Sequence, residues 1–202
     1  MSGIYDEDYY STINYLDYLK RGGRYEQLAD EIMNHLKIHS LDKGPILDFG
    51  CAVGLLLDGL KKIGYNDIYG VDISDWAVKQ AQSRGHTVHK KPLFDSVHGV
   101  TFALDVLEHM TEDEMRSFLI NLGTKVLVFR MPIRREEDHD YFLECSRADP
   151  THTICWTKEQ WKKQFMEFGY IPLDINLHTI YNSIGVYSGI AIHPTFMDYF
   201  NE

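Results

Sequence analysis

Two acidic residues and a glycine-containing loop are the features of the sequence whose types and spacing point to chemistry. An apolar run ends at Asp48, a loop with Gly50 and Gly54 follows, and a second apolar run has a helical pattern up to residue 60. Such a loop presents backbone N–H groups to an anionic part of a ligand. Asp72 follows at the distance, about 20 residues, at which a carboxylate holds a ribose diol. Together these residues predict a site for a nucleoside-containing cofactor.

The spacing of the glycines separates two classes of cofactor site. A dinucleotide site needs G-x-G-x-x-G after its strand, but this chain has Gly50, Ala52 and then Leu55 at those three positions. The pattern Asp48-x-Gly50-x-Ala52-x-Gly54 instead resembles motif I of the class I S-adenosylmethionine (SAM) methyltransferases. That motif is an acidic residue followed by G-x-G-x-G, and only its middle glycine is replaced here.

The resemblance covers nearly the whole chain. Residues 100–110 look like the fourth strand and following turn of that family, residues 125–135 like its fifth strand, and residues 149–171 like the segment that leads to its last helix and sixth strand. The chain is similar to small-molecule methyltransferases of the ubiquinone-biosynthesis type and of sugar and natural-product pathways. The resemblance implies an α/β, Rossmann-like fold: a mostly parallel seven-stranded sheet with helices on both faces and an antiparallel last strand.

The resemblance also implies which residues bind SAM. The loop would face the carboxylate of the methionine part, Asp48 its ammonium group and Asp72 both ribose hydroxyls. Ile73 would pack on the adenine ring, and Asp105 would line the methionine or sulfonium region. The implied set is Asp48, Gly50, Cys51, Ala52, Gly54, Asp72, Ile73 and Asp105. The contact to the adenine amino group stays open. Residues 87–96 offer Lys90, Lys91 and then Asp95, and Leu93 or its backbone is the alternative.

Methyl transfer from a sulfonium needs little covalent help, because positioning alone supplies on the order of 7 to 11 kcal/mol in favourable cases. A base is needed only where the acceptor is protonated. His109, just after Asp105, and His139, in the charged segment after the fifth expected strand, are the candidate bases. The alternatives are that His109 orients its turn and that His139 belongs to a solvated loop.

Two groups of residues have side chains that bind metals. Asp138, His139 and Asp140 offer oxygen and nitrogen ligands, and His152 with Cys155 would suit zinc. Neither group has a complete set of ligands, so the sequence predicts no metal.

These residues need a framework of alternating strands and helices. Apolar spacing predicts helices over residues 28–36, 55–63 and 76–81, and strands near 45–48, 67–71, 171–177 and 184–192. Ser74 is the expected N-cap of the third helix, and two capping boxes are expected, at Thr111 with Glu114 and at Thr157 with Gln160. Residues 1–24, rich in tyrosine and acid, are expected to form an arm or lid on a SAM-binding core at 25–202, in one domain.

Composition restricts the partners. The chain has 202 residues, of which 44% are hydrophobic, a net charge of −10 and a pI of about 5.4. Such a charge disfavours nonspecific binding to nucleic acid or to anionic membranes. Three cysteines without a paired spacing, and a start that lacks a basic and apolar leader, predict a cytoplasmic protein. The expected partner is a small-molecule acceptor, and the oligomeric state is not readable from one chain.

The predicted function is therefore SAM-dependent transfer of a methyl group to an oxygen, nitrogen or carbon atom of a small metabolite. One alternative is a non-catalytic binding module that keeps the fold and contacts a protein partner through its acidic, tyrosine-rich face. Another is aminopropyl transfer from decarboxylated SAM, a reaction that would not need a carboxylate-binding loop.

Overall fold

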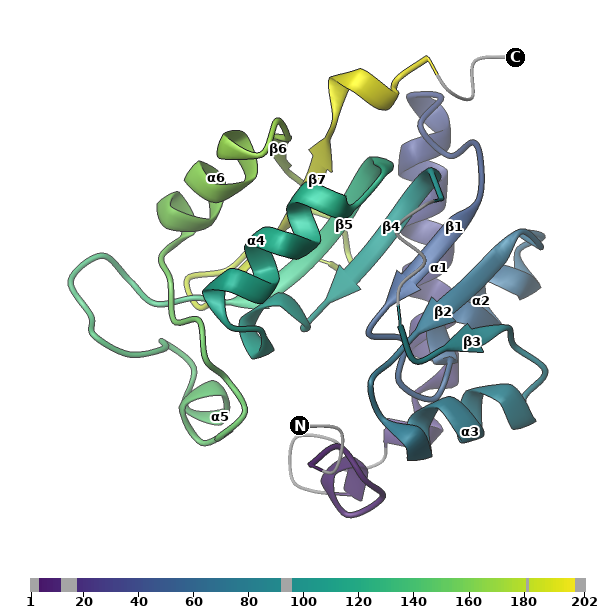
Figure 1. Ribbon diagram of the computed structural model, residues 1–202, viewed down its shortest axis with the longest axis horizontal. Helices are drawn as coiled ribbons and strands as arrows, with labels where there is room; N and C mark the ends of the chain where they lie inside the picture. The colour runs from purple at the N-terminus through teal and green to yellow at the C-terminus, as the bar shows by residue number, and fades with distance from the viewer. Residues whose placement is uncertain (1–3, 12–17, 92–95, 181, 199–202) are drawn as a thin grey trace. The chain divides into compact units, whose positions relative to one another are not determined.

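Within the part of the chain that the structure describes, seven β-strands form the framework, in the order β3-β2-β1-β4-β5-β7-β6 (Figure 1). The pairs β1–β2, β2–β3 and β4–β5 are parallel. β7 runs antiparallel to both of its neighbours, β5 and β6. The predicted fold class, a mostly parallel sheet with an antiparallel last strand, is confirmed.

The computed structural model describes residues 4–11, 18–91, 96–180 and 182–198. The chain divides into two units, residues 1–93 and 94–202. The division into an arm, residues 1–24, and a core, residues 25–202, of one domain stays a prediction.

The first unit alternates helices with the three parallel strands. After the short 3-10 turns Tyr9–Ser11 and Tyr18–Lys20, its elements are α1 (Gly22–Ile38), β1 (Ile46–Phe49), α2 (Leu55–Lys62), β2 (Ile68–Val71), α3 (Asp75–Ser83) and β3 (Val88–His89). α1 lies against α2. The helical spacing noted in the sequence is the buried face of α1, which consists of Leu28, Ala29, Ile32, Met33 and Leu36.

The second unit contains the remaining four strands. Its elements are β4 (His98–Leu104), the 3-10 turn η4 (Leu107–His109), α4 (Glu112–Asn121), β5 (Thr124–Pro132), α5 (Glu144–Arg147), α6 (Lys158–Glu167), β6 (Ile171–Asp174), β7 (Val186–Ile192) and η5 (Pro194–Phe196). β4 and β5 are almost completely buried on both faces. Most positions of these two strands are apolar, as is usual for strands covered on both faces.

The helix caps follow the local sequence signals. Ser74 accepts from the backbone N–H of Ala77 at the start of α3. Thr111 with Glu114 and Thr157 with Gln160 form complete capping boxes at the starts of α4 and α6. All three predicted caps are confirmed.

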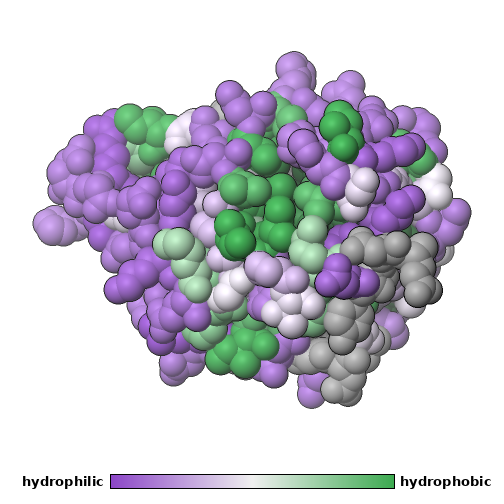
Figure 2. All heavy atoms as spheres, turned by 90° about the horizontal axis from the view of Figure 1, so that it is seen from above, coloured by the Kyte–Doolittle hydropathy of each residue, from purple (hydrophilic) through white to green (hydrophobic). Residues whose placement is uncertain are grey.

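The surface is mixed in character. Figure 2 shows hydrophobic side chains gathered near the centre of one face, with hydrophilic side chains around them. None of the helices in the described residues has the length and apolar character needed to cross a membrane.

Candidate functional site

The loop between β1 and α2 is tied to the end of β2 by hydrogen bonds. The backbone N–H groups of Gly50 and Cys51 donate to the carbonyl oxygen of Val71, at 2.7 and 3.0 Å. The N–H of Ala52 then donates to Oδ2 of Asp72 at 2.8 Å. The motif loop and the carboxylate of Asp72 are therefore held as one structure.

Asp72 is held through its second oxygen as well. The backbone N–H of Ser74 donates to Oδ1 of Asp72 at 2.8 Å. Each carboxylate oxygen has two lone pairs, so each can accept one further hydrogen bond. A rigid carboxylate with two remaining acceptor positions is suited to a pair of neighbouring hydroxyl groups, such as a ribose diol.

The loop needs backbone conformations that favour glycine. Gly50 and Gly54 have φ values of +77° and +83°, and Ala52 between them has φ +46°. A left-handed conformation costs a non-glycine residue about 1 to 2 kcal/mol. Ala52 thus adopts the left-handed conformation expected of the glycine that it replaces in the motif, and the loop keeps its path.

Close packing fixes a further glycine near the loop. A Cβ atom on Gly70, in β2, would lie 2.6 Å from Sγ of Cys51 and 3.0 Å from Cδ1 of Leu57. Cys51 therefore packs directly on β2, where a larger side chain at either position would push the loop away.

The electrostatics of the loop favour a cationic group. Burial, with a further contribution from Asp72, raises the pKa of Asp48 to about 8. Burial also raises the pKa of Asp72, and the N–H groups of Ser74 and Ala52 partly oppose that rise. Two neighbouring buried carboxyl groups are stabilised in their charged form by an added positive charge.

Tyrosines of the N-terminal segment pack on this loop. Tyr10 and Tyr18 belong to a buried cluster with Ala52 and Val53, and the ring of Tyr10 stacks on Trp76 at 5.2 Å. Burial and the charge of Asp72 raise the pKa of the Tyr10 hydroxyl. The hydroxyl of Ser74 donates to the carbonyl of Tyr5. The described residues of the arm are therefore part of the wall around the motif loop.

Ile73 follows Asp72 directly. Its side chain is 48% exposed, which leaves apolar surface beside the buried carboxylate. An aromatic ring held by Asp72 through an attached sugar would have a hydrophobic partner there.

In the second unit, Asp105 lies just beyond β4. It has φ +56°, and its oxygens accept from Nε of Arg130 at 3.0 and 3.1 Å. Arg130 is in β5, so this ion pair joins the ends of two neighbouring parallel strands. Ligands of open α/β sheets bind at such carboxyl ends.

Two polar residues, Glu108 and His109, follow Asp105 in the 3-10 turn η4. The segment that follows α5 is bonded to η4, because the N–H groups of Thr153 and Ile154 donate to the carbonyl of Glu108 at 2.8 and 3.1 Å. The rings of His109 and His152 consequently meet at 4.6 Å in an edge-to-face arrangement.

Burial controls the charge state of this cluster. Burial and the neighbouring His152 lower the pKa of His109 to about 4. Burial, followed by the charge of Asp105, raises the pKa of the Glu108 carboxyl well above its ordinary value. His109 is therefore neutral near pH 7.

The site residues that the sequence predicted are divided between the two units of the chain. Asp48, the loop residues Gly50, Cys51, Ala52 and Gly54, and Asp72 and Ile73 lie in the first unit. Asp105 and His109 lie in the second unit, before and at the end of η4. His139 is exposed in the segment between β5 and α5. Leu93 and Asp95, considered for the adenine contact, lie outside the described residues.

Sequence reasoning missed the meeting of Glu108 and His109 with His152. It placed His152 with Cys155 because they are close in the chain. No spacing rule joins residues 43 positions apart, and only the tertiary bonds between η4 and the later segment bring them together.

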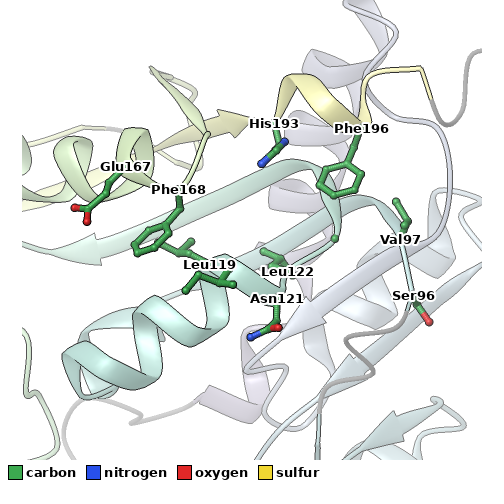
Figure 3. A pocket seen from close by; sticks show the side chains of 11 residues that line it. Ser96, Val97, Leu119, Asn121, Leu122, Glu167, Phe168, His193 and Phe196 are labelled. Carbon is green, nitrogen blue, oxygen red and sulfur yellow. The ribbon is translucent and has the colours of Figure 1, made fainter.

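A separate hollow lies at the other end of β4 (Figure 3). It has a volume of about 580 Å³. Ser96 and Val97 precede β4 there, Leu119 and Leu122 come from the end of α4, and Phe196 comes from η5. Because it opens at the amino end of β4, the hollow is not where a sheet of this kind places its ligand.

Known proteins share this architecture. A family model described as a methyltransferase domain matches residues 20–173. No curated protein has a significantly similar sequence. SAM-bound magnesium protoporphyrin IX methyltransferase from Synechocystis PCC 6803 has a similar fold, with a TM-score of 0.61 and 18% identity over 92% of this chain and 94% of that one.

Two other solved structures have slightly higher TM-scores. SAM-bound CalS10, an amino pentose methyltransferase from Micromonospora echinaspora, gives 0.67 at 14% identity, over 90% of this chain and 97% of that one. DesVI from Streptomyces venezuelae gives 0.66 at 16% identity, over 89% and 96%. The family model spans most of the chain, and the strand order and motif loop agree with it, so the chain belongs to the methyltransferase domain family, as its sequence predicted.

Proposed function

We propose that the chain is a SAM-dependent methyltransferase that acts on an oxygen, nitrogen or carbon atom of a small metabolite. The observation that carries this proposal is the carboxylate of Asp72, which the N–H groups of Ala52 and Ser74 hold at 2.8 Å while its remaining lone pairs are available to a diol. The presence of SAM in two structures of similar fold supports the choice of cofactor.

The residues of the first unit fit the chemical groups of SAM. The buried Asp48 carboxyl, whose pKa is raised to about 8, would gain a counter-charge from an ammonium group. The positive end of the α2 dipole would favour a carboxylate. Asp72 would hold the ribose and Ile73 would pack against the adenine, while Asp105 is proposed as a further cofactor contact.

When bound, SAM supplies a methyl group on a sulfonium centre that is already activated for transfer. The work left to the chain is to hold the donor, to exclude water and to align the acceptor. Tyr10 and Tyr18, which pack on the motif loop, would exclude water from the cofactor. The net charge of −10 favours a neutral or cationic small acceptor over a polyanion.

For a protonated acceptor, His139 is the proposed base. His139→Gln is expected to lower kcat by a factor of about 100 to 10,000, as loss of a general base does, while SAM binding stays unchanged. An unchanged kcat would show that His139 belongs to a solvated loop.

Calorimetric titration with SAM and S-adenosylhomocysteine tests the cofactor assignment. Asp72→Ala is expected to weaken both ligands at least about tenfold, because a charge-assisted hydrogen bond is worth about 1.5 to 3 kcal/mol. Asp75→Ala is the matched control. Asp75 carries the same charge but is exposed on α3, where it pairs with Lys90 at 2.8 Å, and its loss should leave binding unchanged.

Two results would contradict the proposal. Folded wild-type protein that gives no heat with either ligand does not bind the cofactor. A protein that binds decarboxylated SAM more tightly than SAM does not use the loop for a carboxylate, and it would be assigned to aminopropyl transfer.

A further inference from the structure

We propose that Glu108, His109 and His152 form a binding site for a divalent transition-metal ion. One carboxylate oxygen and one ring nitrogen from each histidine lie within 4.8 Å of one another. Among the described residues, these are the three His, Cys, Asp or Glu side chains that converge in this way. The donor set, two imidazoles and one carboxylate, suits zinc, manganese or iron.

The orientation of His152 places a lone pair on its Nε2 atom, which also lies 3.9 Å from Oδ2 of Asp149. Its Nδ1 lies 2.9 Å from the carbonyl oxygen of Ser146. A carbonyl can only accept, so Nδ1 carries the proton and the lone pair of the neutral ring is on Nε2. Metal-binding histidines commonly donate their other N–H to a backbone carbonyl in this way.

Two successive hydrogen bonds orient His109. The hydroxyl of Thr151 donates to Oδ1 of Asp149 at 2.5 Å, because the carboxylate can only accept. The same hydroxyl oxygen therefore accepts the hydrogen bond from Nδ1 of His109, at 2.8 Å. The lone pair of His109 is then on Nε2, which lies 4.0 Å from Oε1 of Glu108.

Glu108 supports the metal site in a way that does not depend on how the two histidines are oriented. Its side chain is fully buried, and neither carboxylate oxygen has a hydrogen-bond partner among the residues that the structure describes. A buried carboxyl group without a hydrogen-bond partner is costly, and a bound cation would stabilise its charged form. A bound cation would satisfy all three groups at once.

The distances are close to those of a metal centre. Ligands about 2.1 Å from a tetrahedral ion lie about 3.4 Å from one another, so rotations that move each side chain by roughly 1 Å would close the set. Three protein ligands leave a coordination position open, as in catalytic rather than structural metal sites.

The proposed role of the ion deepens the proposed function and rests on it. An acceptor hydroxyl at the open position would give up its proton to the proposed base, His139, more readily. The oxygen–carbon bond would form as the carbon–sulfur bond of the donor breaks, and that electron pair would remain on sulfur. The substrate class is therefore a small molecule with an ionisable hydroxyl group.

Direct metal binding tests the site without any assay of activity. The full chain, stripped with a chelator, is titrated with manganese chloride and with zinc chloride by calorimetry, and bound metal is counted after dialysis. We expect one ion per chain, with affinity at least tenfold weaker in Glu108→Gln and in His152→Ala.

His39→Ala is the matched control. His39, which caps the end of α1, forms an edge-to-face pair with His35 at 5.2 Å. This variant removes one histidine of a ring pair outside the cluster and should leave binding unchanged. Glu108→Gln keeps the size of the side chain, and its melting temperature is measured so that loss of metal is not mistaken for loss of fold.

The proposal would be overturned if the wild-type protein bound no ion, or if Glu108→Gln bound the ion with the affinity of the wild type. S-adenosylhomocysteine is titrated into the same samples. Metal binding without nucleoside binding would retain the ion site and reject the proposed function, and nucleoside binding without metal binding would do the reverse.

Discussion

At the scale of single residues, Asp48 is the clearest source of pH dependence. Its pKa is raised to about 8 from the value near 4 of an exposed aspartate. The folded state therefore binds the proton more tightly than the unfolded state. Stability is greatest below pH 4 as far as this group is concerned, and it falls as the pH rises from about 4 to about 8.

Asp48→Asn removes this titrating carboxyl group, so the free energy of unfolding should decrease less as the pH rises. Urea denaturation at pH 5, 6, 7 and 8 measures it, since each pKa unit between the two states corresponds to about 1.4 kcal/mol. Asp58→Asn, at a half-exposed aspartate on α2, is the comparison. If wild type and Asp48→Asn have parallel stability profiles, Asp48 does not titrate in this range.

Gly70 makes a second prediction at this scale. Gly70→Ala places a methyl group 2.6 Å from Sγ of Cys51, and overpacking of this kind costs about 1 to 3 kcal/mol. Gly23 is in the first turn of α1, and a Cβ atom there would meet no described residue within 4 Å, so Gly23→Ala should instead stabilise the chain slightly. Chemical denaturation measures both variants.

Cys51→Ala provides the internal check. It removes the sulfur atom that the new methyl group meets, so the double variant should be more stable than the sum of the two single changes predicts. Strict additivity would mean that Gly70 and Cys51 do not pack against each other.

At the scale of elements, the N-terminal arm should contribute to cofactor binding. Tyr10 is buried against the motif loop and stacks on Trp76. Tyr10→Ala removes an aromatic pair worth about 0.5 to 1.5 kcal/mol beyond its burial, so weaker binding of S-adenosylhomocysteine is expected by calorimetry. Leu19→Ala, at a residue that is 57% exposed, should change nothing. Equal affinities would assign the arm to packing alone.

The elements also show what the sequence could and could not predict. Caps at Ser74, Thr111 and Thr157 were predictable because a cap depends on residues three positions apart. The motif loop was predictable because its glycines must take positive φ close to one strand. His152 was not, because its meeting with His109 depends on backbone bonds between η4 and a segment more than 40 residues later. Local rules find loops and caps, whereas clusters built from distant segments need the structure.

At the scale of the whole molecule, the open question is whether the chain unfolds as one domain. One sheet order includes the strands of both units. We therefore expect one calorimetric transition whose measured enthalpy equals its van't Hoff enthalpy, and we expect S-adenosylhomocysteine to raise the temperature of that transition.

Two destabilised variants sharpen this test, one in each unit. Gly70→Ala weakens the first unit, and Thr157→Ala removes the cap of α6 in the second, at a cost of about 1 kcal/mol. In one cooperative domain, either change lowers the midpoint of the same single transition, and the ligand raises it in both variants. Two domains that fold independently would instead give two transitions. Each variant would then shift only the transition of its own unit, and the ligand would shift only the transition of the first unit.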